Sequence, residues 1–146
     1  MRNISIVIIE KPIGQVWDFY LDPSNFNLWL SAFSSIETIN GQWGELNSVI
    51  KHHYEHKGKK MILSETISEL VYHSTIKTIQ ESNLLKTDLL LQFENFDSNS
   101  TKLIAIANTK FKLIHFKFLS FFLHKSFQQR LDNDFFRLKE IMEKSN

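Results

Sequence analysis

The chain has 146 residues, of which 42% are hydrophobic, with 13 Phe, no Cys and a formal net charge of +1. The lack of cysteine excludes disulfides, thiolate metal sites and a cysteine nucleophile, and it fits a reducing compartment. A net charge so close to zero argues against a nucleic-acid partner, because nucleic-acid-binding domains are usually strongly basic. No apolar stretch reaches the roughly 18 residues of a membrane span, and the N-terminal apolar run is too short for a signal peptide. We therefore expect one cytoplasmic domain over residues 1–146.

The N-terminal part of the chain predicts a strand followed by two short helices. Residues 3–10 are rich in β-branched side chains, which is typical of a strand. Pro12 suits the first turn of a helix, and apolar residues over 16–20 follow it at helical spacing. A break at Asp22 ends this helix, and Asp22 or Ser24 is the expected N-cap of the next one.

From residue 33 onward the hydrophobic pattern changes to a period of two, which is typical of strands. Turn residues separate the segments, so we expect an antiparallel meander. The expected strands cover residues 33–40, 46–56, 60–70, 71–80, 84–96 and 101–113. Residues 114–144 carry apolar side chains every three or four positions and predict one long helix. This order of elements indicates an α+β fold with helices on one side of the sheet.

The segment "KPIGQVWDFYLDPSNFNLWL", residues 11–30, resembles the N-terminal signature of the START-like superfamily, also called SRPBCC. The resemblance is to its polyketide cyclase/dehydrase and lipid-transport branch in particular. The positions that match the signature are Pro12, Val16, Trp17, Asp22 and Trp29. Gly44 before the third strand and Thr101 at the start of the last strand also match, so the resemblance covers nearly the whole chain.

The resemblance implies a single START-like domain with a helix-grip fold, in which a curved antiparallel sheet of about seven strands wraps around the long C-terminal helix. It also implies a cavity between sheet and helix for an apolar or amphipathic small molecule. We expect no cofactor. Members of the superfamily include lipid and hormone carriers, aromatase/cyclases and co-chaperone-like ATPase activators. The activators often carry two tryptophans in the second short helix, whereas this chain has the single Trp29 there.

Three histidines, His52, His53 and His56, lie within "KHHYEH", and their closeness suggests a metal site. Successive side chains of a strand point to opposite faces, so His52 and Tyr54 point inward while His53 points outward. His52 and His56 share a face but lie roughly 13 Å apart, too far to bind one ion. We therefore expect no metal here. His52 and Tyr54 are expected either to line the cavity as polar groups or to pack in the core.

The following strand places Glu65 on its more apolar face, together with Met61, Leu63 and Ile67. A carboxyl group in such surroundings has a raised pKa unless it is paired. Glu65 is then a candidate general acid/base or ligand anchor, with His52 as the second candidate catalytic residue. A salt bridge, or a register shift that turns Glu65 to solvent, is the alternative.

The remaining inward positions follow from the same alternation. On the strand expected over 71–80 we predict Tyr72, Ser74, Ile76 and Thr78 to point inward. Two alanines on the last strand either let the helix approach closely or leave room for a ligand. The predicted ligand-binding residues are Phe26, Trp29, Ile50, His52, Tyr54, Leu63, Glu65, Ile76, Leu91, Phe93, Ala105, Ala107, Phe116, Leu119, Leu123 and Phe127.

Three functions are compatible with these patterns. The first is a non-enzymatic binding protein that holds a small hydrophobic or amphipathic molecule between the sheet and the C-terminal helix. The second is a polyketide cyclase/dehydratase-like enzyme in which Glu65 or His52 transfers protons. The third is a protein-interaction module that acts through the Phe-rich start of the last helix, residues 116–127. The alternatives for this segment are that it packs in the core, forms a gate over the cavity or makes a homodimer contact.

Overall fold

The structure, a computed structural model, describes residues 1–145 except the side chains of 114–120. The chain begins with β1 (Arg2–Ile9), α1 (Ile13–Leu21), the short 3-10 helix η1 (Pro23–Asn25) and α2 (Phe26–Trp29). Six strands and one helix follow: β2 (Phe33–Asn40), β3 (Val49–His56), β4 (Lys59–Val71), β5 (Thr75–Glu81), β6 (Leu85–Asp97), β7 (Ser100–Phe111) and α3 (Ile114–Lys144). No described helix has both the length and the apolar character needed to cross a membrane.

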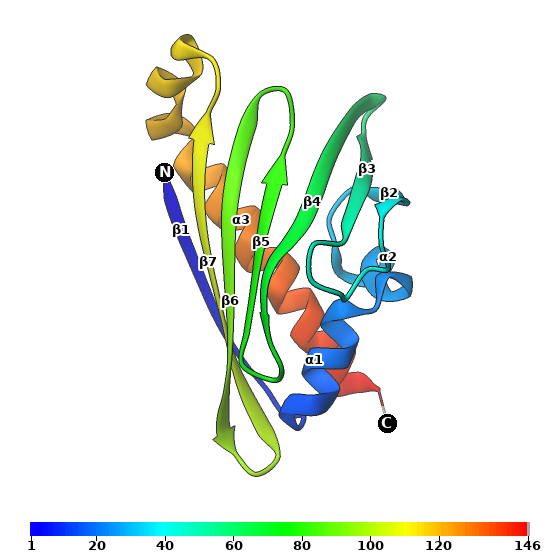
Figure 1. Cartoon of the computed structure of the whole chain (residues 1–146). Helices are drawn as coiled ribbons and strands as arrows, with labels where there is room; N and C mark the ends of the chain where they lie inside the picture. Colours follow the sequence, from blue (N-terminus) through cyan, green and yellow to red (C-terminus); the bar gives the residue numbers. More distant parts are fainter. Residues whose placement is uncertain (146) are drawn as a thin grey trace.

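The seven strands form one antiparallel sheet in the order β1-β7-β6-β5-β4-β3-β2. Only β1 is out of sequence order, because it pairs with β7 at the end of the meander. Figure 1 shows α3 running obliquely across one side of this curved sheet, with α1 and α2 beside its C-terminal half. The predicted α+β helix-grip fold is therefore confirmed.

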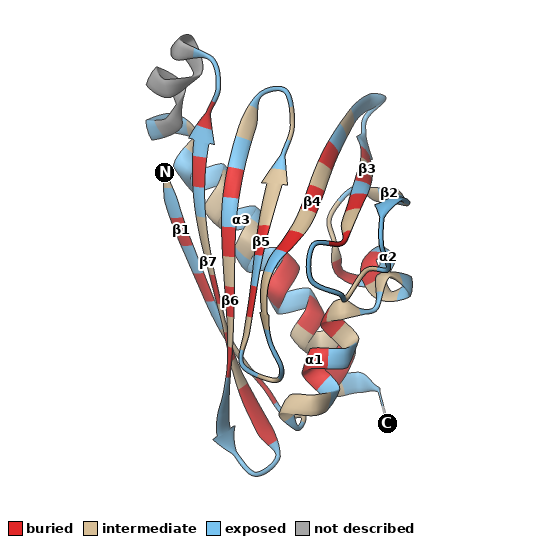
Figure 2. Cartoon of the chain, in the orientation of Figure 1, coloured by how far each residue is buried: buried red, intermediate tan, exposed pale blue. Residues whose placement is uncertain are grey.

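The core lies between the sheet and the helices. Buried side chains alternate with more exposed ones along the strands, so one face of the sheet packs against the helices (Figure 2). The C-terminal half of α3 contributes Phe135, Leu138 and Met142 to this core. From α1, the Trp17 ring meets the Phe93 ring of β6 edge to face at 5.0 Å. Burying each such side chain stabilises the fold by roughly 1.5–3 kcal/mol.

Two details of the N-terminal helices follow the sequence. Pro12 precedes the first turn of α1, and Asp22 accepts hydrogen bonds from the backbone N–H and the hydroxyl of Ser24 at 3.0 and 2.7 Å. Asp22 therefore caps η1, as one of the two predicted caps. The missing N–H of Pro23, the first residue of η1, costs nothing there because helix-start donors have no partner inside the helix.

The strand predicted over 71–80 begins four residues later, at Thr75. β4 runs on to Val71, and a turn that includes His73 with a φ of 58° separates it from β5. Tyr72 and Ser74 are exposed turn residues, so their predicted inward orientation is wrong. Ile76 and Thr78 lie within β5 and are buried, as predicted.

Candidate functional site

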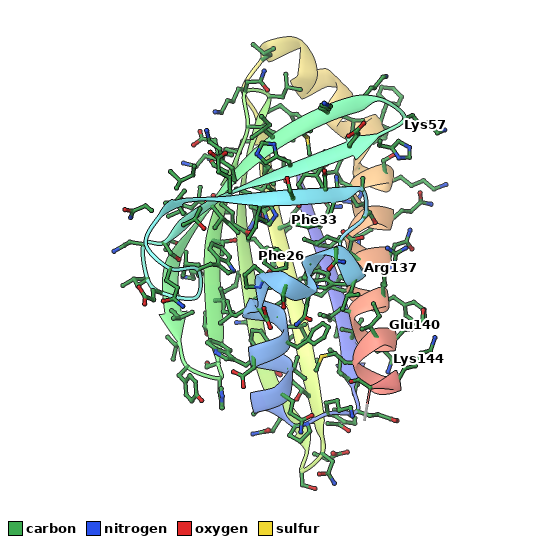
Figure 3. All side chains as sticks on the ribbon, turned by 90° about the vertical axis from the view of Figure 1, so that its right-hand side faces the viewer. Phe26, Phe33, Lys57, Arg137, Glu140 and Lys144 are labelled. Atoms are coloured by element: carbon green, nitrogen blue, oxygen red, sulfur yellow. The ribbon has the colours of Figure 1, made fainter. Side chains whose placement is uncertain are left out.

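A cavity of about 160 Å³ lies between the sheet, α2 and α3. Its wall is rich in aromatic rings, which come from α1, α2, α3, the strand β3 and the loop before β3: Tyr20, Phe26, Trp29, Trp43, Tyr54, Phe127 and Phe135. In Figure 3, Phe26 and Phe33 mark the passage from α2 to β2, close to α3. A concave site with an apolar wall and a few polar groups is the usual form of a small-molecule site.

The polar part of the wall is a cluster of side chains around Glu65. Nε2 of His52 lies 2.8 Å from Oε1 of Glu65, and both side chains are almost fully buried. The hydroxyl of Thr78 and the amide of Gln80 each donate to Oε2 at 2.8 Å. The carboxylate therefore has partners on three sides.

Strand register explains how residues far apart in the sequence meet at Glu65. Gln80 on β5 is directly opposite Glu65 on β4, while Thr78 is its diagonal neighbour. On the other side, Glu65 pairs with Ile50 of β3, which makes His52 the second diagonal neighbour. Long side chains reach across such diagonals in an antiparallel sheet.

The hydrogen bonds decide the charge of Glu65. Burial alone would raise its pKa, but the hydrogen bond and charge of His52, with the bonds from Gln80 and Thr78, lower the pKa overall. Glu65 is therefore the paired carboxylate, not the neutral acid expected for an unpaired group. Because a carboxylate only accepts hydrogen bonds, Nε2 of His52 carries the proton between them.

Aromatic rings hold the His52 imidazole in place. It stacks on the rings of Phe26 and Tyr54, with centroids 5.5 and 5.7 Å away. Its Nδ1 atom lies 3.5 Å from the Tyr54 hydroxyl, at the outer limit of a hydrogen bond. Burial and the negative charge of Glu65 raise the pKa of Tyr54, so this hydroxyl keeps its proton and acts as a donor.

A second carboxylate, Asp134 on α3, lies where α3 meets the segment after α2. It accepts hydrogen bonds from the hydroxyl of Ser31 and, at 3.1 Å, from the Ser31 backbone N–H. Burial raises its pKa, although Ser31 and the nearby Arg130 act in the opposite direction. The exposed Arg130 guanidinium lies 5.0 Å from the centre of the Tyr54 ring, so this side of the wall is next to solvent.

The structure brings about half of the predicted site residues to the cavity wall. Those that line it are Phe26, Trp29, His52, Tyr54, Leu63, Glu65, Ala107 and Phe127. Phe116 and Leu119 have side chains outside the described part of the structure. Whether the lining residues contact a ligand stays a prediction.

The other predicted site residues do not line the cavity. Ile50, Ile76, Leu91, Phe93 and Ala105 are buried in the core, and Leu123 is half-buried on α3. The reason is visible on the last strands, where Ala107 pairs with Leu89 at the cavity and Ala105 pairs with Leu91 in the core. Ala105 and Leu91 belong to a core cluster that also includes residues of α1 and of the C-terminal half of α3.

Sequence reasoning missed many wall residues: Asn3, Tyr20, Leu30, Trp43, Met61, Gln80, Leu85, Thr87, Leu89, Thr109, Arg130, Leu131, Asp134 and Phe135. Strand alternation does place most of these strand residues inward, and Leu131 and Phe135 share the helical spacing of Phe127, but neither pattern tells a cavity wall from core. Trp43 lies in a loop, where no periodic pattern applies.

The histidine-rich stretch is divided between the two faces of the sheet, as predicted. His52 points into the core, whereas His53 is half-exposed and lies 3.6 Å from Glu37 on the outer face. His56 is exposed at the end of β3. Among the described residues, no group of three or more His, Asp or Glu could hold a metal ion.

No family model matches the sequence, and no curated protein matches it either. Solved structures do resemble the fold. The Zhui aromatase/cyclase from Streptomyces sp. R1128 is 11% identical, with a TM-score of 0.82 over 98% of this chain and 93% of its own. A conserved protein from Geobacillus kaustophilus is also 11% identical, with a TM-score of 0.82 over 99% and 97%.

Ara h 8.0201 is 17% identical, with a TM-score of 0.75 over 99% of both chains. At these identities the likeness shows the fold alone. It confirms the predicted helix-grip fold along almost the whole chain. It leaves the ligand and the activity to be argued from the cavity.

Proposed function

We propose that this protein binds a small amphipathic molecule in the cavity between the sheet and α3. The observation that carries the proposal is an aromatic-walled space of about 160 Å³ with the Glu65 cluster on its wall. An apolar cavity of about 150 Å³ is large enough to bind benzene. The ligand is therefore about the size of one substituted ring or a short chain, and larger molecules require the wall to rearrange.

The charge of the wall favours a particular class of ligand. Glu65 is ionised, and three of its lone-pair sites are occupied by His52, Thr78 and Gln80. A carboxylate has about four such sites, so a ligand hydroxyl or amine has one place to donate. A second buried anion close to Glu65 would be repelled in this low-dielectric site. We propose a neutral or cationic ligand group here rather than a carboxylate.

Thermal denaturation with a matched set of small aromatics tests this proposal. Benzyl alcohol and benzylamine are expected to raise the midpoint, while benzoate has a smaller effect. A ligand at a hundredfold excess over its Kd adds about 2.7 kcal/mol to the free energy of unfolding. No shift with any member of the set, together with no bound species in native mass spectrometry, contradicts the proposal.

A second candidate is a cyclase/dehydratase-like enzyme, favoured by the orientation of His52. In the neutral imidazole with Nε2–H directed to Glu65, the Nδ1 lone pair is next to the Tyr54 hydroxyl and is able to accept a proton. The shared fold with an aromatase/cyclase supports this candidate without establishing it. If Glu65→Gln binds a reactive ligand as the wild type does but no longer converts it, the enzymatic role gains support.

A cytoplasmic location stays a prediction.

A further inference from the structure

Two phenylalanines on the N-terminal half of α3 face solvent. Phe121 is 84% exposed and Phe122 is 74% exposed, and their rings meet edge to face with centroids 5.6 Å apart. Lys125 is exposed and lies four residues after Phe121 and three after Phe122, so it is on the same helix face as the pair. An apolar pair of this size on a surface helix marks a contact with something else.

Exposed basic residues lie at the same end of the molecule, on α3 and on the outer face of the sheet. His124 donates from Nε2 to the Arg2 carbonyl at 3.0 Å, which places this part of α3 beside the start of β1. Arg2 is opposite Asn108 on β7, two residues from Lys110, and Lys110 is directly opposite Lys86 on β6. We call Phe121, Phe122, Lys125, Arg2, Lys86 and Lys110 the Phe–basic patch.

Acidic residues do not balance the charge of the patch. Glu81 on β5 is directly opposite Lys86, but it forms its ion pair with Lys112, at 2.7 Å. Asp88, opposite Asn108, is the exposed carboxylate near Arg2. Two lysines directly opposite each other on one sheet face repel, and an anionic surface relieves that repulsion. The chain as a whole carries a formal charge of only +1, so the positive charge is concentrated at this end.

We propose that the Phe–basic patch docks on an anionic lipid surface. Exposed aromatic rings insert into the interfacial region of a bilayer, and neighbouring lysines and arginines are attracted to acidic headgroups. Protein interfaces are instead depleted of lysine, and a nucleic-acid-binding domain usually has a much larger positive charge. The combination of two exposed phenylalanines and four basic residues therefore fits a lipid surface best.

The patch is close to one end of the cavity. Phe127 lines the cavity and packs against Phe111, one and a half helical turns beyond Phe121. Thr109, which also lines the cavity, is next to Lys110 in β7. Docking would place this end of the cavity near the bilayer, where small apolar molecules partition. Docking on a bilayer is distinct from ligand binding and can be measured without any ligand.

Co-sedimentation with lipid vesicles tests the docking. We expect the protein to bind vesicles of equimolar phosphatidylcholine and phosphatidylglycerol, and to bind phosphatidylcholine vesicles far less. Phe121→Ala/Phe122→Ala should lower binding at least about tenfold, because each loses an inserted ring. The matched control is Phe96→Ala, since Phe96 is 59% exposed at the far end of the sheet, at the β6–β7 hairpin. It should bind as the wild type does.

Charge reversal gives the second arm of the test. Lys86→Glu/Lys110→Glu should weaken binding to the anionic vesicles by about tenfold or more, because each basic residue near such a surface contributes about 1 kcal/mol. Added salt should weaken wild-type binding in the same direction. Circular dichroism of each variant shows whether the fold is retained.

Several outcomes overturn the proposal. One is that the wild type sediments equally with neutral and with anionic vesicles. Another is that Phe121→Ala/Phe122→Ala sediments with anionic vesicles as much as the wild type does. A third is a concentration-dependent dimer that the double variant abolishes without any vesicle binding, which would assign the patch to self-association. Salt-sensitive binding to single-stranded oligonucleotides in place of vesicles would assign it to nucleic acid.

Discussion

Nε2 of His52 lies 2.8 Å from Oε1 of Glu65, in a buried pair that connects β3 to β4. The pair is the polar centre of the cavity wall, since Thr78, Gln80 and Tyr54 are arranged around it. Removing one member of a buried pair leaves the other without its partner, which is costly. The pair therefore matters for stability, and in the proposed function it also selects the ligand.

Replacing Glu65 should destabilise the fold in a graded way. We expect Glu65→Ala to lower the free energy of unfolding by about 3–5 kcal/mol, because His52, Thr78 and Gln80 all lose their acceptor. Glu65→Gln keeps an acceptor oxygen and should cost about 1–3 kcal/mol. Urea denaturation at pH 7 measures both. Equal stability of Glu65→Ala and wild type would show that the pair contributes nothing.

The pH dependence of stability should carry the signature of Glu65. Its folded pKa lies below the unfolded value of about 4.3. A carboxyl group of this kind stabilises the fold above its unfolded pKa, and this stabilisation is lost as the pH falls through the folded pKa. Below about pH 4, the denaturation midpoint of the wild type should fall more steeply than that of Glu65→Gln. Parallel curves would contradict the lowered pKa.

Trp29 should act through packing rather than through its indole N–H. Its ring contacts those of Tyr20, Phe26 and Phe135, and its Nε1 has no hydrogen-bond partner among the described residues. Trp29→Ala is expected to cost about 3–5 kcal/mol of unfolding free energy. Trp29→Phe should cost clearly less, because no hydrogen bond is broken. A similar loss for both variants, measured by urea denaturation, would point to a bond that involves Nε1.

Strand alternation predicts the antiparallel meander and the orientation of the central polar residues, whereas the helix-grip fold is what the family resemblance implies. Alternation placed His52, Tyr54 and Glu65 on the inward face because their neighbours on that face are apolar. It also separated His52 from His53, which turned an apparent metal cluster into one wall residue and one surface residue. The order of elements and the helical spacing of residues 114–144 predicted the architecture.

The limits of the cavity depend on packing between distant elements, which alternation does not report. Ala105 and Ala107 have the same inward orientation, yet only Ala107 lines the cavity, whereas Ala105 is fully buried in a core cluster that includes residues of α1 and of the C-terminal half of α3. The contact of Asp134 with Ser31 joins residues 103 positions apart. The sequence leaves a paired Glu65 as one alternative, but identifying its partners requires the strand register.

Isothermal titration of benzyl alcohol into wild type and Ala107→Leu tests the central claim most directly. Ala107 is half-buried on the cavity wall, so a leucine there occupies part of the 160 Å³ space without burying a polar group. We predict saturable binding of one molecule to the wild type and at least about tenfold weaker binding to the variant, a difference of about 1.4 kcal/mol or more. No binding to the wild type, or equal binding to both proteins, would contradict a ligand site between the sheet and α3.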